Sequence, residues 1–381
     1  MHRRPLIAHI VHRFDIGGLE NGVVNLINHM PEHKYRHVII CMTDYSDFHK
    51  RIEKNGIEIY ALHKKEGKDP LNYLRLWRLL RRLKPDISHT RNIATIDGAV
   101  IAMLAGVKHR VHGEHGRDIY DVDGSNARYQ RLRRLCQPFI HRFIALSKDL
   151  EAWLIEQVGI KRDKVVQLYN GVDTDKFRPH KTDINGFLNE TFVSNDEVIF
   201  GTVGRFEPIK DQLTLLRAFA DLLEKSPLAK DQARLVLVGD GQLKPQIEQF
   251  INNQGLQSFV RLTGKSNDVA HLLQAFDVFV LPSLAEGISN TILEAMASGL
   301  PVLATHVGGN VELVEPEVTG QLVPPARPDM MAKKMLEYLE LPECIHKQGL
   351  LAVKKVEQRF SIQQMVERYM SVYDVLLTGK S

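Results

Sequence analysis

The sequence predicts an α/β protein of two domains, each built on a parallel sheet that helices cover. Short runs rich in Val and Ile alternate with segments of helical periodicity along the chain. Strands that are apolar on both faces belong to parallel sheets with helices on both sides. The alternation restarts at Glu197 after a polar stretch. The length of 381 residues also exceeds the roughly 250–300 residues at which single cores stop growing.

The strand candidates divide between the two halves of the chain. The first half contains candidates at 6–11, 38–42, 57–62, 86–90, 110–115, 143–147 and 165–169. The second half contains candidates at 198–203, 234–238, 260–263, 278–281 and 302–305. The polar stretch 173–196 between them has no clear periodicity, so we place the boundary there, with domains at 1–176 and 177–360. Open α/β sheets bind ligands at the carboxyl ends of their strands, which predicts a cleft between two facing domains.

Composition restricts the function classes. The chain is 44% hydrophobic and 25% charged, as soluble globular proteins are, and its net charge of +4 does not indicate a nucleic-acid partner. Its three cysteines, Cys41, Cys136 and Cys344, have no metal-ligand spacing and favour a reducing compartment. No apolar run reaches the roughly 18 residues of a membrane-spanning helix. His9 and His12 interrupt the apolar start of the chain, so we interpret it as a buried strand rather than a signal peptide and expect a cytoplasmic protein.

Two basic segments, 74–84 and 128–134, lie in the N-terminal half. Both have the composition of helices with one cationic face. Such a face is either solvated or in contact with an anionic membrane surface or an anionic acceptor. Both interpretations remain open at this point, and the second places the protein on the inner face of the membrane.

The strongest motif follows the strand candidate at 278–281. A polar loop carrying Glu286 leads into a helix that starts near Asn290, contains Glu294 and ends at Gly299. The free N–H groups at a helix start form an anion site, and a nearby carboxylate can accept hydrogen bonds from a ribose. Each glutamate alone would be explained as a dipole partner or a surface residue. The complete strand–loop–helix pattern favours a nucleotide site.

A second motif, Gly-Arg-Phe-Glu-Pro-Ile-Lys-Asp at 204–211, also follows a strand candidate. Asp211 is placed to cap the helix that follows. Arg205 and Lys210 would project from the strand end, where a departing nucleoside diphosphate needs either Mg²⁺ or fixed cations. Surface ion pairing is the alternative.

Two weaker motifs lie in the first half. Gly17 and Gly18 follow the first strand and allow close approach of a ligand, but the pattern is not that of a nicotinamide site. His112 and His115 point to opposite faces of a strand, which disfavours a shared metal and leaves His115 as a strand-end contact for a sugar. The Asp-x-Asp strings at 121–123 and 173–175 follow no apolar strand, so we interpret them as surface carboxylates rather than Mg²⁺ ligands.

Taken in order, these motifs resemble glycosyltransferase family 4, retaining enzymes of the GT-B fold. The resemblance spans almost the full chain and includes the residues at 17–20, 115–118, 145–147, 170–173, 204–206, 210–211, 238–241, 263–265 and 286–294. It implies two Rossmann-like domains facing across a cleft, with the amphipathic segment 361–381 returning to the N-terminal domain. It also implies sugar transfer from a nucleotide-diphosphate sugar to a saccharide or lipid-linked acceptor, without metal or cofactor. Bacterial exopolysaccharide or glycolipid synthesis is the process that it suggests.

The resemblance implies a role for each matching residue. Arg205 and Lys210 hold the diphosphate, Glu286 orients the donor sugar, and His115 touches that sugar. Glu294 takes the ribose hydroxyls. The remaining donor contacts are Gly17, Gly18, Gly264, Lys265, Ser289, Asn290 and Thr291. Ile288 and Ser289 depart from the residues frequent at these positions, which leaves the donor undefined.

Three alternatives remain distinct from transfer. A nucleotide-sugar epimerase of the same fold would need additional acid and base carboxylates. A non-catalytic nucleotide-sugar-binding protein would have lost Arg205, Lys210 or Glu286, and all three are present. A membrane-surface scaffold would leave the second-half motifs unexplained. We expect retention because the first half offers no convincing carboxylate base for inversion. The nearest candidates are Glu114, which alternates away from His115, and Asp118, which can be explained as the cap of a turn.

Overall fold

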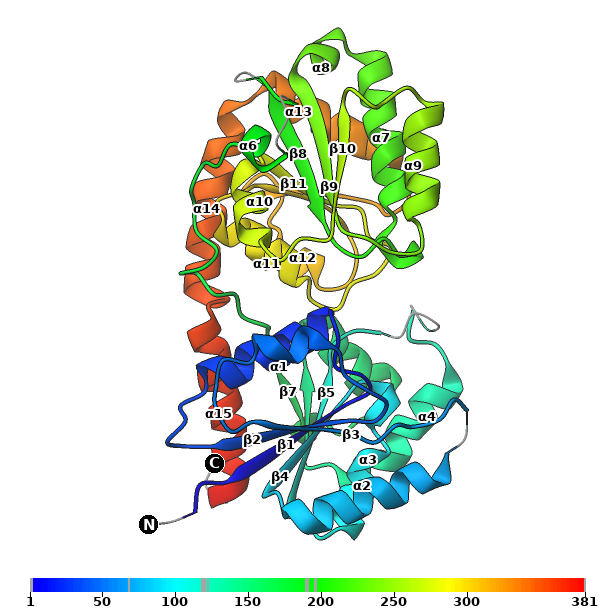
Figure 1. Cartoon of the computed structure of the whole chain (residues 1–381), viewed down its shortest axis with the longest axis vertical. Helices are drawn as coiled ribbons and strands as arrows, with labels where there is room; N and C mark the ends of the chain where they lie inside the picture. The colour runs from blue at the N-terminus through cyan, green and yellow to red at the C-terminus, as the bar shows by residue number, and fades with distance from the viewer. Residues whose placement is uncertain are drawn as a thin grey trace. The chain divides into compact units, whose positions relative to one another are not determined.

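The computed structural model describes residues 3–67, 69–117, 121, 123–188, 192–194 and 197–379. The chain forms two compact units (Figure 1). Unit 1 comprises Met1–Gly171 with Ile362–Ser381, and unit 2 comprises Val172–Ser361. The division lies a few residues before the boundary placed at 176. The expected α/β architecture of two parallel-sheet domains is confirmed.

Unit 1 is built on a parallel sheet. Among its described residues the sheet has seven strands in the order β3-β2-β1-β4-β5-β6-β7. The strands are β1 (Leu6–Val11), β2 (Arg36–Cys41), β3 (Glu58–Ala61), β4 (Ile87–Arg91), β5 (His109–Glu114), β6 (Arg142–Ala145) and β7 (Val165–Gln167). The main helices are α1 (Gly18–His29), α2 (Pro70–Leu83), α3 (Gly98–Leu104), α4 (Ala127–Cys136), α5 (Lys148–Ala152) and α15 (Ile362–Thr378).

Alternate side chains of the unit 1 sheet enter two apolar layers. Ile10 and Ile40, which are paired in register, pack with Leu76 of α2 on one face. Ile39 packs with Ile27 of α1 on the other face. Figure 1 shows α1 on one side of this sheet and α2 and α3 on the opposite side. Burial on both faces is the reason that β1 and β2 carry apolar side chains toward both layers.

Unit 2 repeats the architecture. In the described part of this unit, six parallel strands lie in the order β10-β9-β8-β11-β12-β13. The strands are β8 (Val198–Val203), β9 (Ala233–Val238), β10 (Val260–Gly264), β11 (Val278–Leu281), β12 (Val302–Thr305) and β13 (Gly320–Val323). The helices are α6 (Ile184–Leu188), α7 (Gln212–Lys225), α8 (Pro227–Gln232), α9 (Lys244–Asn253), α10 (Val269–Ala275), α11 (Asn290–Ala297), α12 (Asn310–Leu313), α13 (Pro328–Glu340) and α14 (Glu343–Arg359). The sequence did not predict β13, because its four residues include Gly320 and Gln321 and form no apolar run.

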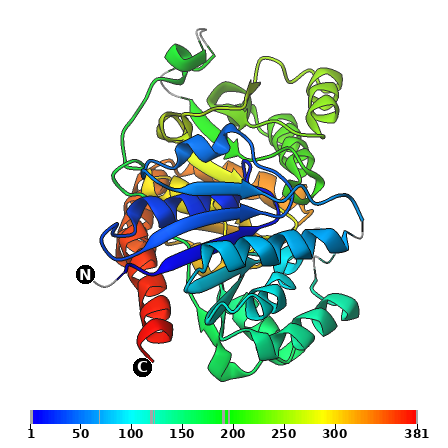
Figure 2. The same ribbon diagram turned by 60° about the horizontal axis from the view of Figure 1, so that its bottom comes forward.

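The last helix, α15, is part of unit 1. It packs beside α1, and Figures 1 and 2 show it in red against that unit. The Tyr373 hydroxyl lies 2.8 Å from Nδ1 of His89 in β4, and Lys34 forms an ion pair of 2.7 Å with Asp374. An apolar stripe that includes Ile362, Met365, Val366 and Tyr369 is buried, as helical spacing predicts. No helix among the described residues is long and apolar enough to cross a membrane.

Candidate functional site

Each sheet has a point at which the strand order reverses. In unit 2 the chain runs outward from β8 to β10 on one side and from β11 to β13 on the other, so the reversal lies between β8 and β11. In unit 1 it lies between β1 and β4. Open α/β sheets bind ligands at such switch points, beyond the carboxyl ends of the strands. The motifs at 204–211 and 282–294 follow β8 and β11, so the fold places both at the unit 2 switch point.

The loops after β8 and β11 are joined by an ion pair. Nζ of Lys210 lies 2.5 Å from Oε1 of Glu286, and both side chains are largely buried. The hydroxyl of Ser283 donates to the same carboxylate oxygen at 2.6 Å. The backbone N–H of Leu284 donates to the carbonyl of Ile209 at 2.8 Å. Lys210 and Glu286, which the sequence nominated from separate motifs, are therefore in direct contact.

The loop that carries Glu286 is supported from β12. The Thr305 hydroxyl donates to the carbonyl of Ser283 at 2.6 Å, and the Asn310 side chain donates to the carbonyl of Thr305 at 3.1 Å. Gly308 has a φ of +47°, and a Cβ there would lie 1.8 Å from the Glu286 carbonyl oxygen. Only glycine allows this close approach. The backbone of Glu286 is thus fixed by the neighbouring loop.

The helix after this loop begins where the sequence predicted. Ser289 is the N-cap of α11, and its hydroxyl accepts from the N–H of Ile292 at 3.3 Å. The hydroxyls of Ser289 and Thr291 lie 3.0 Å apart. Asn290 is the first residue of the helix, and Glu294 follows one turn later on it. These residues gather hydroxyl, amide and carboxylate groups at the start of α11, where free N–H groups attract anions.

Arg205 is the exposed cation of the switch point. Its side chain is 59% exposed, and its guanidinium lies 3.8 Å from Glu207. Its backbone carbonyl accepts from the Gln212 side chain at 2.9 Å. Asp211 occupies the N-cap position of α7 with a φ of +46°, but its side chain makes no capping hydrogen bond, so the predicted cap is wrong. In this left-handed conformation the side chain does not reach the free N–H groups of the helix.

Gly264 and Lys265 lie at the end of β10. Gly264 has a φ of +74°, and its carbonyl accepts from the N–H of Gly239 at 2.9 Å. β9 separates β10 from β8 in the sheet, so these two residues lie further from the switch point than Arg205.

In unit 1, the predicted Gly17 and Gly18 follow β1 at the start of α1. Gly17 is the N-cap residue, and Gly18 is the first residue of the helix. A Cβ on Gly17 would lie 2.2 Å from a carboxylate oxygen of Glu20, so glycine at 17 allows Glu20 to fold back over the helix start. The negative carboxylate is favourable there, because the helix start carries partial positive charge.

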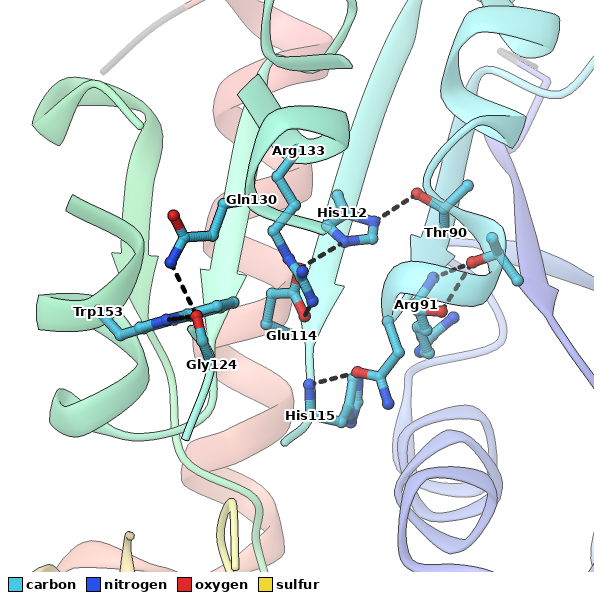
Figure 3. Close-up of polar contacts among 11 residues, drawn as sticks. Thr90, Arg91, His112, Glu114, His115, Gly124, Gln130, Arg133 and Trp153 are labelled. Atoms are coloured by element: carbon cyan, nitrogen blue, oxygen red, sulfur yellow. Dashed lines mark hydrogen bonds and ion pairs between the residues drawn. The ribbon is translucent and has the colours of Figure 1, made fainter. Parts of the chain in front are cut away.

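Glu114, the last residue of β5, is locked in a buried polar network (Figure 3). Arg133 of α4 binds both of its oxygens, at 2.6 and 3.1 Å, and Nε2 of His112 lies 3.1 Å from Oε1. Burial alone would raise the pKa of Glu114, but the charge of Arg133 and the hydrogen bond from His112 outweigh it and lower the pKa to about 2. Glu114 is therefore an ionised structural carboxylate and has no free oxygen with which to act as a base. Asp118, the other candidate base, lies outside the described residues.

His115 follows Glu114 directly and points away from this network (Figure 3). Its backbone N–H donates to the side chain of Asn92 at 2.7 Å. Both ring nitrogens are buried and have no hydrogen-bond partner among the described residues. Burial, and secondly the charge of Arg91, lower the pKa of His115 well below its ordinary value, so the ring is neutral. A neutral imidazole offers one donor and one acceptor, which suits a sugar hydroxyl.

The Asp-x-Asp strings have local structural roles. Asp121 is 6% exposed rather than a surface residue, because it accepts from the N–H of Asn126 and stabilises the turn before α4. Asp173 accepts from the N–H groups of Asp175 and Lys176 in a turn. Within the described ranges no group of three or more His, Cys, Asp or Glu side chains is arranged to hold a metal.

The basic segments correspond to α2 and α4. On α2, the residues Leu71, Leu74, Arg78, Arg81 and Arg82 are exposed at spacings that place them on one face. Trp77 is half-buried and donates to the carbonyl of Leu104 at 3.2 Å, so it is not a free aromatic anchor. On α4, Arg133 is buried against Glu114 and does not belong to a cationic surface.

Several residues of these sites were missed from the sequence. Ser283, Thr305 and Asn310 support Glu286, but serine, threonine and asparagine in loops carry no distinctive signal. Asn92 and Arg133 contact β5 from other elements. The backbone of Asn92, with a φ of 54° and a ψ of 171°, is unusual for any residue other than glycine, so the residue type gave no signal for it.

Comparison with known proteins gives consistent results for both halves of the chain. Residues 16–176 match the family model described as Glycosyltransferase Family 4, and residues 197–341 match Glycosyl transferases group 1. An Escherichia coli UDP-Gal:α-D-GlcNAc-diphosphoundecaprenol α-1,3-galactosyltransferase is 30% identical, over 84% of each chain. The Bacillus subtilis glycosyltransferase EpsF, whose assignment is putative by name, is 30% identical over 78% of each chain.

Solved structures agree in fold. Anabaena HepE, crystallised with UDP-glucose, superposes with a TM-score of 0.83 at 23% identity, covering 97% of this chain and all of that one (100%). A sucrose-phosphate synthase from Thermosynechococcus elongatus superposes with a TM-score of 0.80 at 19% identity, covering 99% of this chain and 100% of its own. Together with the family matches and the two parallel-sheet units, these likenesses establish that the chain belongs to the family 4 glycosyltransferases of GT-B fold.

Proposed function

We propose that the protein is a retaining, metal-independent glycosyltransferase that transfers a hexosyl group from a UDP-sugar to a saccharide or lipid-linked acceptor. The observation that carries this proposal is the unit 2 switch point, where Lys210 and Glu286 are in contact and Arg205 is exposed. A nucleoside diphosphate requires cations at this position. The choice of UDP is supported by the E. coli relative and by the complex of HepE, and that relative also supports a lipid-linked acceptor. A role in exopolysaccharide synthesis is part of the proposal.

Each predicted residue keeps its proposed role in this reaction. Arg205 and Lys210 stabilise the negative charge that develops on the diphosphate as the bond to the anomeric carbon breaks. Glu286 holds Lys210 and orients the sugar, and Glu294 binds the ribose. Further donor contacts are His115, Gly17, Gly18, Gly264, Lys265, Ser289, Asn290 and Thr291.

Retention of the anomeric configuration is supported by the inability of Glu114 to act as a base. Single inversion needs a base that activates the acceptor hydroxyl on the face opposite the leaving group. Glu114 is ion-paired on both oxygens and has a pKa of about 2, so it cannot take that proton at neutral pH. We propose that the acceptor oxygen bonds to the anomeric carbon on the side from which the diphosphate departs. The hydroxyl proton then passes to the departing phosphate oxygen.

A transfer assay tests the proposal. Purified protein is incubated with UDP-glucose, UDP-galactose or UDP-N-acetylglucosamine, a lipid-linked N-acetylglucosamine acceptor and excess EDTA. We expect UDP release coupled to acceptor glycosylation with one of these donors. Loss of all turnover that Mg²⁺ or Mn²⁺ restores would contradict metal independence. UDP release without acceptor product, or epimerised donor, would favour the epimerase or another alternative.

We also propose that α2 attaches unit 1 to an anionic lipid surface at the inner face of the membrane. Leu71 and Leu74 are 64% and 40% exposed, and Leu104 of the adjoining α3 is 60% exposed. Arg78, Arg81 and Arg82 continue the same exposed face of α2. Apolar side chains followed by cations suit the boundary between acyl chains and anionic headgroups.

Liposome co-sedimentation tests this attachment. Wild-type protein should sediment with vesicles containing phosphatidylglycerol and much less with phosphatidylcholine alone. The triple variant Arg78→Glu/Arg81→Glu/Arg82→Glu should lose most of the bound fraction. The matched control Lys225→Glu/Lys230→Glu, in unit 2, should keep it. Equal recovery of the wild type with both lipids, or no recovery, would show that α2 is only a solvated helix.

A further inference from the structure

Asn92 connects the ends of two central strands of unit 1. It follows β4 directly, and its backbone, with a φ of +54° and a ψ of 171°, lies near a region that glycine adopts and other residues rarely do. Its backbone N–H donates to the carbonyl of Gly113 at 2.8 Å, and its side-chain oxygen accepts from the N–H of His115 at 2.7 Å. One residue therefore holds the chain on both sides of Glu114, at the point where β5 ends.

The ring of His115 lies back over Gly113. A Cβ at position 113 would be 2.9 Å from Nε2 of His115 and 3.2 Å from Nε2 of His89. Only glycine at 113 leaves this space to the imidazole. The Nε2 atom of His89 and both ring nitrogens of His115 are buried without a partner among the described residues. Buried polar groups are generally satisfied by protein, water or ligand, so the ring nitrogens of His115 are open to a hydroxyl group that binds beside them.

The other side of β5 cannot adjust to a change at His115. Glu114 is fixed by Arg133, and Trp153 stacks on that guanidinium at 4.7 Å from the ring centroid. The indole N–H of Trp153 donates to the carbonyl of Gly124 at 3.1 Å, as Figure 3 shows. Since Glu114 is held on this side, the hydrogen bond that the His115 N–H donates to Asn92 fixes the direction in which the chain leaves the strand.

We infer that Asn92 is a positioning residue for His115: it fixes the strand end so that the imidazole meets a hydroxyl of the donor sugar from one orientation. This inference rests on the proposed function, in which His115 contacts that sugar. Displacement of a reacting or contacting group by about 1 Å can lower turnover by about 10²-fold. Asn92 itself makes no contact with substrate in this account.

Two substitutions separate the hydrogen bond from the backbone conformation. Asn92→Gly keeps the positive φ but removes the acceptor, whereas Asn92→Asp keeps both. Hydrogen exchange should show faster exchange of the His115 N–H in Asn92→Gly and slow exchange in Asn92→Asp. Turnover of Asn92→Gly should fall roughly 10- to 100-fold, with a change of Tm no larger than that of Asn92→Asp. Gly113→Ala, which displaces the ring directly, should reduce turnover without releasing the His115 N–H.

A double-mutant cycle decides between positioning and general stability. If Asn92 acts through His115, adding Asn92→Gly to His115→Ala should cause little further loss of turnover, because the two effects are not additive. Independent, multiplicative losses would overturn the inference. Full turnover in Asn92→Gly despite fast exchange at His115 would also overturn it and would leave the proposed function intact. No transfer by the wild type would instead overturn the proposed function, and this inference with it.

Discussion

The two units share a sheet architecture but bury different side chains. Among the described residues, those of unit 2 that are polar and buried as whole residues carry hydroxyl or amide side chains, such as Thr202, Gln212, Ser283 and Asn310. Its buried carboxylates, Glu197 and Glu286, belong to partly exposed residues and are paired with Arg234 and Lys210. Unit 1 buries acidic, basic and imidazole groups: His9, His37, Asp69, His89, Arg91, His112, Glu114, Asp121 and Arg133. The charges of unit 2 that we assign to the donor, Arg205 and Lys210, lie at its switch point instead.

This difference predicts that the buried charged and imidazole groups of unit 1 contribute mainly to folding stability. In unit 1 a chain of contacts runs from His37 through His9 and Arg91 to His89 and Tyr373, with the first two of these contacts at 3.0 and 2.9 Å. A buried charged group is costly if its partner is removed. The charge of Arg205 at the unit 2 switch point can be removed with less effect on folding, because its side chain is 59% exposed. Substitutions in this buried network of unit 1 should therefore affect stability first, and substitution of Arg205 at the unit 2 switch point should affect turnover first.

The largest effect is expected for the Glu114–Arg133 pair. Glu114→Gln should destabilise unit 1 by about 3–5 kcal/mol, because the Arg133 charge stays buried without its partner. Hydrogen exchange resolved by peptide should show unit 1 opening while unit 2 keeps its protection. The control is Lys225→Met, which breaks an exposed pair with Asp221 and should cost less than about 1 kcal/mol. Equal loss of protection in both units would contradict the comparison.

The second-largest effect is expected on turnover, when Arg205 is substituted. Arg205→Ala should lower kcat by about 10²–10³, the loss typical of one removed transition-state donor. Its Tm should change little, since the side chain is 59% exposed. Arg217→Ala on the exposed face of α7 serves as the control and should retain kcat. If Arg205→Ala turned over normally, the assignment of this residue would be wrong.

A smaller effect, which increases gradually as pH falls, is expected on the stability of unit 1. Burial lowers the pKa of His37 from 6.5 to about 3 and depresses those of His9 and His89 strongly. These rings are neutral in the folded state, so the unfolded chain binds more protons as pH falls below about 6.5. Their contribution to the free energy of unfolding is complete above that pH and declines toward pH 3. Glu114 has a pKa of about 2 in the folded state and an ordinary value of 4.5. Its contribution to the free energy of unfolding therefore starts to decline as pH falls through 4.5.

Unfolding measured by unit as a function of pH checks this expectation. Unit 1 should lose protection against hydrogen exchange between pH 6.5 and 4 well before unit 2. His37→Gln should flatten the pH dependence of unit 1, because one titrating group is removed. A unit 2 that opened first in acid would show that the buried histidines do not govern the order.

The sequence predicted the elements better than the contacts between them. The strand, loop and helix from 278 to 297 were foreseen because apolar runs, a polar loop and a terminal glycine are local signals. Arg133 was assigned to a cationic surface because helical periodicity does not show which partner a helix meets. Its carboxylate partner lies 19 positions earlier in the chain, on another element. For the same reason, the sequence did not predict the contact of Ser283 with Glu286 or of Asn92 with His115.

The residues that we assign to the donor were predicted from a different kind of signal. Lys210 and Glu286 belong to separate motifs, and only the parallel order of β8 and β11 brings them together. Their residue types and the resemblance to the family were enough to predict both as site residues from the sequence alone. Nothing local predicted the hydrogen bonds that hold them, because those partners are common loop residues.

The most direct test of the proposed function is the anomeric configuration of the product. NMR of the glycosidic linkage should be recorded on product formed from an α-linked UDP-sugar in the presence of EDTA. We expect an α-linked product, because Arg133 sequesters Glu114. We propose that Arg205 and Lys210 stabilise the departing diphosphate. A β-linked product would contradict retention and would require a base other than Glu114.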